Sequence, residues 1–391
     1  MKKYISLFFS LLIVLSGKAV NMDNLQVSLL TVLPRSNQVY TVYGHSALRL
    51  SSPGEGLDEV YNWGTFDFDD SPFFIYRFIK GETDYFLSST SFSSFIAYYT
   101  YVNSTVKEQI LNLTNEEKRE LVKLIATNQL PENIIYRYNF LFDNCTTRIR
   151  DIIEESTNNS LTYPRQEKQV TSRELIHSCT NPYPWMTFGI DLIIGSGADS
   201  LISMREEMFL PVNLMNVLDE SYIIEEGEVN RPIVSSNLTV FQAIPRPHSS
   251  SFFDSPLYIG ILIFFIYLGL AFWGVIKKRQ LRGAFSILFL LAGVAGCIVG
   301  FLLVGSTHPC VSPNWNILWL HPFHFIGFIG YFFRKSYPLI SLYHIVNLLL
   351  LCFLLISWQW LPQTLNTANI PYMLCMAMAS GLWLFSTKRK K

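Results

Sequence analysis

The chain has 391 residues, of which 50% are hydrophobic and only 15% are charged. Soluble globular proteins carry about 25% charged residues, so the composition argues against an ordinary soluble enzyme. The formal net charge is zero, but the ten basic residues that follow Pro256 have no acidic counterpart. Residues 1–255 therefore hold 20 basic and 30 acidic residues, a net charge of −10. This separation of charge indicates two environments and excludes the clustered basic surface of a nucleic-acid-binding protein.

The N-terminus has the form of a secretory signal peptide. Lys2 and Lys3 precede an apolar run over Tyr4–Leu15, and Gly17 and Ala19 place small residues before a cleavage site after Ala19. The run is too short to span a bilayer comfortably. The predicted domains are a signal peptide (1–19), an exported domain (20–255) and a transmembrane domain (256–391).

Five apolar segments after Pro256 are candidate membrane spans, each of which needs roughly 20 residues. They are Leu257–Ile276, Gly283–Val304, Asn314–Phe333, Leu339–Ser357 and Pro371–Phe385. All ten basic residues fall into alternate loops and the C-terminal tail, whereas loops 305–313 and 358–370 hold none. Basic loops stay in the cytoplasm. We therefore predict a multi-pass membrane protein with an exported N-terminal domain, five transmembrane helices and a cytoplasmic tail.

The exported domain has the pattern of an α+β fold. Strands are predicted at Gln26–Val32 and Ala47–Ser51, and a returning strand at Glu59–Phe68. The spacing of apolar residues predicts a helix over Asn115–Asn128, with Thr114 as its cap.

Cys145 stands between a predicted strand and a predicted helix. The aromatic run Tyr136–Phe142 precedes it, and Thr146–Ser156 follows with helical spacing. A thiol at a helix N-terminus is close to unpaired N–H groups and the positive end of the helix dipole, which favour the nucleophilic thiolate. A small buried cysteine, or a disulfide with Cys179, explains the position about equally well.

His45 is the candidate base for such a thiolate. A lone histidine at a strand start is more often structural, but this one opens a hairpin whose second strand carries Asn62 and Asp67. A tight turn would place Asn62 opposite His45, and a longer loop would bring Asp67 closer. We choose Asn62 as the residue that orients the imidazole, in the general arrangement of nucleophile, base and orienting group.

The segments GHSALRL, YNWGTFDF and NCTTRIRD resemble a circularly permuted papain-like fold, the arrangement of lecithin:retinol acyltransferase-like enzymes. In such enzymes the histidine opens a strand and the cysteine opens a helix. The resemblance implies that Cys145 is the catalytic nucleophile, His45 its base and Asn62 the orienting residue.

A closer resemblance covers nearly the whole chain. With the signal peptide and five spans, the segments DLIIGSGADS…EEMFLP and STHPC…NWNILWLHP resemble the Lnb lipoprotein N-acyltransferase family. This implies transfer of a fatty acyl chain from a membrane phospholipid, through a Cys145 thioester, to the α-amino group of a diacylated lipoprotein's N-terminal cysteine, without a cofactor. It also implies that the protein lies in the bacterial inner membrane, with its N-terminal domain in the periplasm and its C-terminal tail in the cytoplasm. Two alternatives stay open: a membrane-anchored cysteine hydrolase of the cell envelope (amidase, peptidase or lipase), and a non-enzymatic assembly protein.

Four further residues are candidates for substrate binding: Arg148, His308, Asn314 and His321. Arg148 could hold either a phosphate or the active-site loop. The other three lie near the outer ends of predicted spans, where an interfacial belt of Trp and His explains them at least as well as headgroup binding. The sequence lacks paired CxxC and HExxH motifs, so we expect no metal site.

Three expectations concern the surroundings of the thiol. The aromatic segment Phe73–Phe95 is either core or the lining of an acyl tunnel. His177, beside Cys179, is interpreted as structural, because adjacent helical residues do not face each other. Since both implied substrates are lipid-anchored, Cys145 should lie close to the membrane surface.

Overall fold

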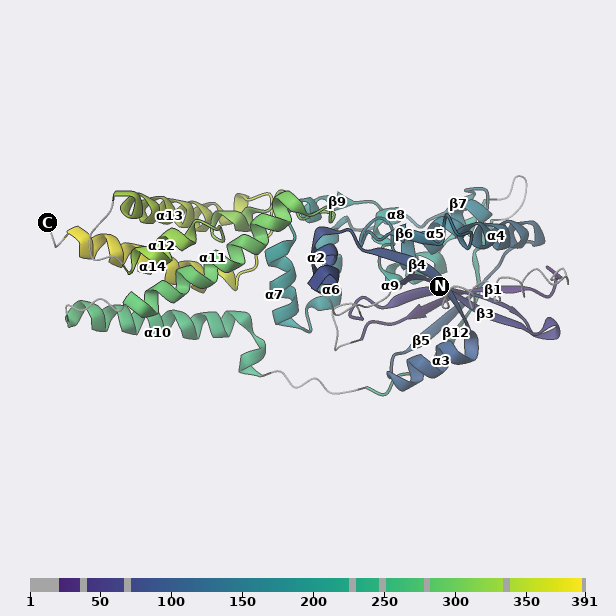
Figure 1. Ribbon diagram of the computed structural model, residues 1–391. Helices are drawn as coiled ribbons and strands as arrows, with labels where there is room; N and C mark the ends of the chain where they lie inside the picture. The colour runs from purple at the N-terminus through teal and green to yellow at the C-terminus, as the bar shows by residue number, and fades with distance from the viewer. Residues whose placement is uncertain are drawn as a thin grey trace.

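The computed structural model describes residues 21–35, 41–66, 72–224, 230–245, 251–277, 282–332 and 338–388. The predicted signal peptide and Asp67 lie outside the described residues, as do most of the basic residues on which the predicted orientation depends. In Figure 1 the C-terminal helices gather at one end of an elongated molecule and the large sheet at the other.

The N-terminal domain is built on a seven-stranded sheet of order β12-β5-β1-β2-β3-β4-β6, in which every neighbouring pair is antiparallel. Its strands are β1 (Gln26–Val32), β2 (His45–Ser52), β3 (Leu57–Thr65), β4 (Asp84–Ser91), β5 (Val106–Leu111), β6 (Ile135–Arg137) and β12 (Val234–Phe241). The first three predicted strands are thus confirmed to within a few residues. The predicted strand Tyr136–Phe142 is mostly irregular, because only Ile135–Arg137 pairs with β4.

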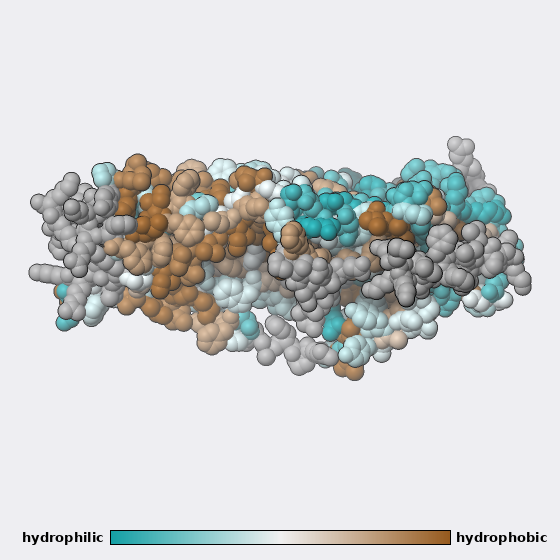
Figure 2. Space-filling view, in the orientation of Figure 1, coloured by the Kyte–Doolittle hydropathy of each residue, from teal (hydrophilic) through white to brown (hydrophobic). Residues whose placement is uncertain are grey.

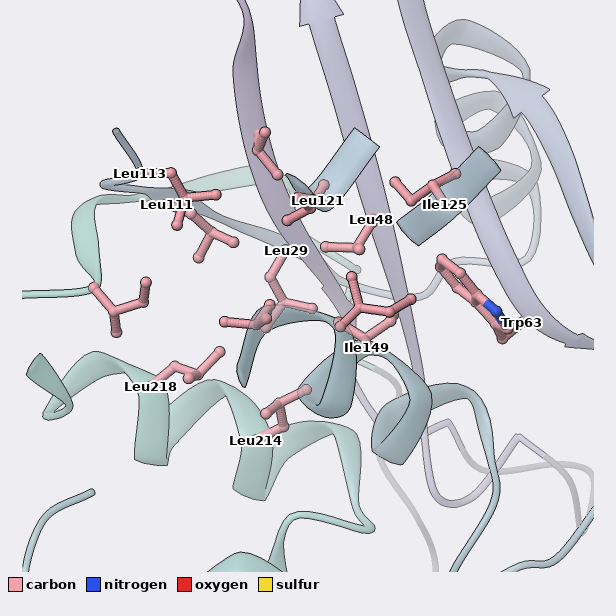
Figure 3. Packing of buried hydrophobic residues seen from close by; sticks show 14 of the residues in the cluster. Leu29, Leu48, Trp63, Leu111, Leu113, Leu121, Ile125, Ile149, Leu214 and Leu218 are labelled. Atoms are coloured by element: carbon pink, nitrogen blue, oxygen red, sulfur yellow. The ribbon is translucent and has the colours of Figure 1, made fainter. Parts of the chain in front are cut away.

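Side chains that alternate along the strands supply two separate cores. Leu29, Leu48 and Trp63 face one side of the sheet, where they pack with Leu121 and Ile149 (Figure 3). The helices on this side are α4 (Asn115–Asn128), α5 (Cys145–Ser156) and α9 (Pro211–Asp219). The opposite side is covered by α3 (Phe92–Tyr101). Both predicted helices are confirmed, and Thr114 caps α4 in a reciprocal capping box with Glu117.

Shorter elements fill the space between the sheet and the C-terminal helices. The helices α2 (Pro72–Lys80), α6 (Ser172–Thr180) and α7 (Pro184–Ile193) lie there in Figure 1. The remaining elements are η1 (Pro53–Glu55), β7 (Leu161–Thr162), β8 (Val170–Thr171), η2 (Ser196–Asp199), β9 (Leu201–Ile202), α8 (Met204–Glu207), β10 (Tyr222–Ile223), β11 (Arg231–Pro232) and η3 (Phe252–Asp254).

The C-terminal domain contains five helices among the described residues, and Figure 2 shows apolar side chains gathered over this end of the molecule. They are α10 (Pro256–Ile276), α11 (Arg282–Gly305), α12 (His324–Gly330), α13 (Pro338–Ser357) and α14 (Asn369–Lys388), with the short turns η4 (Trp315–Leu318) and η5 (Trp358–Trp360). Three described helical segments are long and apolar enough to cross a membrane: Pro256–Ile276, Gly283–Gly305 and Pro338–Trp360. The shorter Asn369–Phe385 is also apolar.

The third predicted span, Asn314–Phe333, is not one continuous helix. Its described part consists of the turn Trp315–Leu318, an irregular stretch and the seven-residue helix His324–Gly330. The amides of Asn314 and Asn316 donate to backbone carbonyls of α7 and are buried there. Irregular backbone at membrane depth is tolerated where protein surrounds it, and these contacts provide that surrounding.

Candidate active site

Cys145 and His45 are each the first residue of their element, and the two elements pack together. Asn144 caps α5: its side-chain oxygen accepts from the N–H groups of Thr146 and Thr147 at 2.8 and 2.9 Å. Its amide nitrogen donates to the carbonyls of Phe140 and Phe209 at 2.7 and 3.0 Å, which ties the helix start to two neighbouring segments. The thiol is therefore held on a rigid helix end.

The His45 imidazole is oriented by Asn62. Its Nε2 lies 3.1 Å from the Asn62 side-chain oxygen, which can only accept, so Nε2 donates. The strands pair Leu48 with Tyr61, so position 62 lies opposite position 47 and Asn62 reaches His45 diagonally. The predicted direct opposition of the two residues is wrong, because the turn over Pro53–Gly56 shifts the register; the predicted contact nevertheless forms.

The pair has the electrostatics of a thiolate and an imidazolium. The side chains of His45 and Cys145 are within hydrogen-bonding range, and the contact with Asn62 leaves Nδ1 to face the sulfur. Burial alone would raise the pKa of the thiol and lower that of the imidazole. Burial is the largest single effect on each group, but the attraction between their opposite charges and their hydrogen bonds together outweigh it, so the pKa of Cys145 is lowered and that of His45 is raised. Polar groups of Ser46 and Thr146 further favour the thiolate.

Tyr136 also lies at this site, although the sequence did not predict a role for it there. Its hydroxyl is buried and donates to no acceptor among the described residues, although the backbone N–H of Gly64 lies near its oxygen. A Cβ built on Gly64 would lie 3.9 Å from this hydroxyl, 3.9 Å from the Cys145 nitrogen and 3.5 Å from the Cys145 Cβ. Because Gly64 has no side chain, a space remains next to the Cys145 thiol, bordered by the Cys145 N–H and the Tyr136 hydroxyl. Burial raises the pKa of Tyr136, so its hydroxyl keeps its proton.

The disulfide alternative is contradicted, because Cys145 and Cys179 are both free thiols. Cys179 packs in a different apolar cluster, and burial raises its pKa. The neighbouring His177 donates to the Asp191 carboxylate at 2.8 Å, which agrees with the structural role predicted for it.

Arg148 is engaged within the protein. Its guanidinium donates twice to Asp143, at 2.5 and 2.9 Å, and lies 3.6 Å above the centre of the Tyr136 ring. A further contact reaches Asn128. In this arrangement Arg148 holds the loop that leads to Cys145, one of the two roles considered for it.

The three candidates near the membrane lie outside the immediate surroundings of the thiol. His308 donates from Nε2 to the Phe78 carbonyl at 2.6 Å, and Asn314 donates to the Leu192 carbonyl at 2.9 Å, so both join the C-terminal domain to the N-terminal one. His321 is buried and stacks on His324 with ring centres 3.8 Å apart. No group of three or more potential metal ligands occurs among the described residues.

Two family models match the chain. A model described as the Lnb N-terminal periplasmic domain matches residues 17–178, and one described as the Lnb transmembrane domain matches residues 247–391. No curated protein and no solved structure matches the chain, so the papain-like arrangement stays a prediction. The two matches occur in chain order and coincide with the sheet domain and the apolar helices. The chain therefore belongs to the Lnb family and is a multi-pass inner-membrane protein whose N-terminal domain is periplasmic.

Proposed function

We propose that this protein is a lipoprotein N-acyltransferase with Cys145 as its nucleophile. The observation that carries the proposal is the Cys145 thiol at the start of α5, beside a His45 that Asn62 orients. Membership of the Lnb family supports a lipoprotein-modifying membrane enzyme. The acyl donor would be a phospholipid and the acceptor a diacylated lipoprotein, both held in the membrane that the apolar helices occupy.

In the first half-reaction, the Cys145 thiolate attacks the ester carbonyl of the phospholipid. The developing oxyanion is positioned to accept from the Cys145 N–H, which the Asn144 cap leaves unused, and from the Tyr136 hydroxyl. The ester C–O bond then breaks, and protonated His45 gives its proton to the departing oxygen. The products are a lysophospholipid, neutral His45 and a thioester on Cys145.

In the second half-reaction, the neutral α-amino group of the lipoprotein attacks the thioester carbonyl. His45 takes the proton from the amine, the C–S bond breaks, and the thiolate–imidazolium pair is restored. An amine attacks a thioester far more readily than an oxygen ester, which gives cysteine an advantage over serine as the nucleophile here. A hydrolase on the same site would perform the first half-reaction and use water in the second.

Mass spectrometry tests the proposal directly. Lipoprotein N-termini from a strain with no other such enzyme should carry the N-acyl chain with the wild-type protein and lose it with Cys145→Ser. The control is Cys179→Ser, which should retain N-acylation. The purified wild-type protein incubated with phospholipid should gain one acyl mass on Cys145. Loss of that adduct without N-acylation of any acceptor would indicate a hydrolase, and N-acylation that survives Cys145→Ser would refute the proposal.

A further inference from the structure

The helix α2 presents an unusual surface for a periplasmic domain. Within nine residues it exposes four large apolar side chains: Phe73 (79% exposed), Ile75, Tyr76 and Phe78. Exposed large apolar side chains at this density are typical of a segment that contacts a membrane or another molecule.

The C-terminal half of α2 is fastened to the outer end of a membrane-spanning helix. Carbonyls of its last residues accept from the Ser306 hydroxyl, the Thr307 N–H and His308 Nε2, at 2.8, 2.8 and 2.6 Å. The ring of Tyr76 lies 6.0 Å from that of Phe301, which belongs to α11. The exposed face of α2 therefore continues the apolar surface of the membrane domain at the level where α11 ends.

A series of aromatic rings leads from α2 into the active-site core. Phe78 stacks on Phe74 at 6.4 Å, and Phe74 on Phe66 at 6.2 Å. Phe66 lies 5.0 Å from Tyr85, which stacks on Tyr138 at 4.1 Å. Phe66, Tyr85 and Tyr138 belong to the same apolar cluster as Cys145. Each step is within the range of direct ring contact, so the series is continuous.

We propose that α2 is immersed in the outer leaflet and that this ring series, Phe78–Phe74–Phe66–Tyr85–Tyr138, carries the acyl chain of a membrane phospholipid to Cys145. The occupant is a hydrocarbon chain, because the series begins at the exposed Phe78 on α2, the helix whose Tyr76 contacts Phe301 of the apolar α11. The path keeps an apolar chain in contact with apolar surface from the bilayer to the thiol. The route rests on the proposed function, whereas the immersion of α2 does not.

Photo-crosslinking in the full-length protein tests the immersion. Benzoylphenylalanine replaces Phe73 in one variant and Arg119, an exposed residue of α4 at the far end of the sheet domain, in the control. In vesicles of phosphatidylethanolamine and phosphatidylglycerol with labelled acyl chains, the Phe73 variant should crosslink to lipid and the Arg119 variant should not. Equal yields at the two positions, or a crosslinked protein dimer at position 73, would overturn the proposal.

Acylation of Cys145 by two different acyl donors then distinguishes a defect in the acyl path from a defect in the reaction at the thiol. Phe74→Ala should lower the rate of Cys145 acylation by vesicle phospholipid about tenfold, because apolar contact with the chain is lost. Its acylation by water-soluble p-nitrophenyl acetate should stay unchanged, as should both rates in Tyr101→Ala, which alters an exposed ring outside the series. Equal loss with both donors in Phe74→Ala would refute the path. Failure of the unaltered protein to form any adduct would instead count against the proposed function.

Discussion

At the scale of single residues, the proposed reaction starts from the form of the site in which Cys145 is a thiolate and His45 holds a proton. The lowered pKa of the thiol and the raised pKa of the imidazole both widen the pH range over which that form is populated. Because the first half-reaction needs both the nucleophile and the acid, its rate should rise as pH passes the thiol pKa and fall as pH passes the imidazole pKa.

Removal of Asn62 should narrow this pH range. Its oxygen accepts from Nε2 and favours the charged ring, so Asn62→Ala should lower the pKa of His45 and move the alkaline limb to lower pH. The less charged histidine also stabilises the thiolate less, so the acid limb should move to higher pH. Asn62→Asp should shift the alkaline limb the other way. The rate of acylation by phospholipid vesicles across pH measures both limbs, and coincident profiles for all three proteins would contradict the assigned role.

Tyr136→Phe removes the hydroxyl and keeps the ring that lies beneath Arg148. Loss of one oxyanion donor typically slows such reactions about 100-fold, and we expect a fall of that order in Cys145 acylation. Alkylation by iodoacetamide, which forms no oxyanion, should proceed as in the wild type. Parallel losses in the two reactions would show that the variant disturbs the thiol itself.

The positions of Cys145 and His45 in the fold could be predicted because the sequence signals for them are local. Cys145 follows a capping residue and opens an apolar helix pattern, and His45 opens an alternating strand. Tyr136 had no comparable signal, because its position beside Gly64 depends on the pairing of β6 with β4, which joins distant parts of the chain. The diagonal contact of Asn62 likewise depends on a register that the turn sets.

At the scale of elements, the open space beside Gly64 can be tested with a matched glycine. Gly64 and Gly56 both have positive φ, +85° and +72°, so an alanine at either should cost about 1 kcal/mol in backbone strain. Only at Gly64 would the methyl group point toward the thiol; at Gly56 it meets nothing within 4 Å. Gly64→Ala should thus suppress acylation while Gly56→Ala preserves it, at similar thermal midpoints. Equal activities would mean that this space is not where the carbonyl binds.

The periodicity of apolar residues predicted the long helices and strands well, but it predicted the third membrane span poorly. A hydropathy average over residues 314–333 reflects the apolar side chains of this segment. It carries no information about the side-chain amides of Asn314 and Asn316, which donate to backbone carbonyls of α7. The helix α7 was not anticipated, and its carbonyls accept these amide contacts, which make the irregular backbone of this segment tolerable.

At the scale of the whole molecule, the two domains are joined through a buried carboxylate. Asp191 accepts from Arg173 and His177 of α6 and from Asn366 of the loop before α14. Arg173 is only 2% exposed and also bonds Asp199. This arrangement fixes the sheet domain relative to the membrane helices, as the proposed reaction between two lipid-anchored substrates requires.

Asp191→Ala should destabilise the protein by roughly 3 kcal/mol, because it removes one of the two carboxylates that pair with the buried Arg173 guanidinium. The unfolding midpoint of the detergent-solubilised protein should fall by several degrees. Asp84→Ala is the control: its pairs with Arg77 and Arg137 are exposed, so the change should stay under about 1 kcal/mol. Equal shifts in the two variants would contradict a stabilising role for the buried carboxylate.

The order of strands in the sheet has a consequence for how the protein is made. The family match to the N-terminal domain ends at residue 178, but the sheet takes its edge from β12, and the core takes Leu214 and Leu218 from α9. During export the periplasmic domain therefore cannot complete its fold until Phe241 has crossed the membrane, shortly before α10 must enter it. A soluble fragment cut at residue 178 would leave β5 with an open edge prone to aggregation, whereas one extended through Phe241 would retain both covering elements.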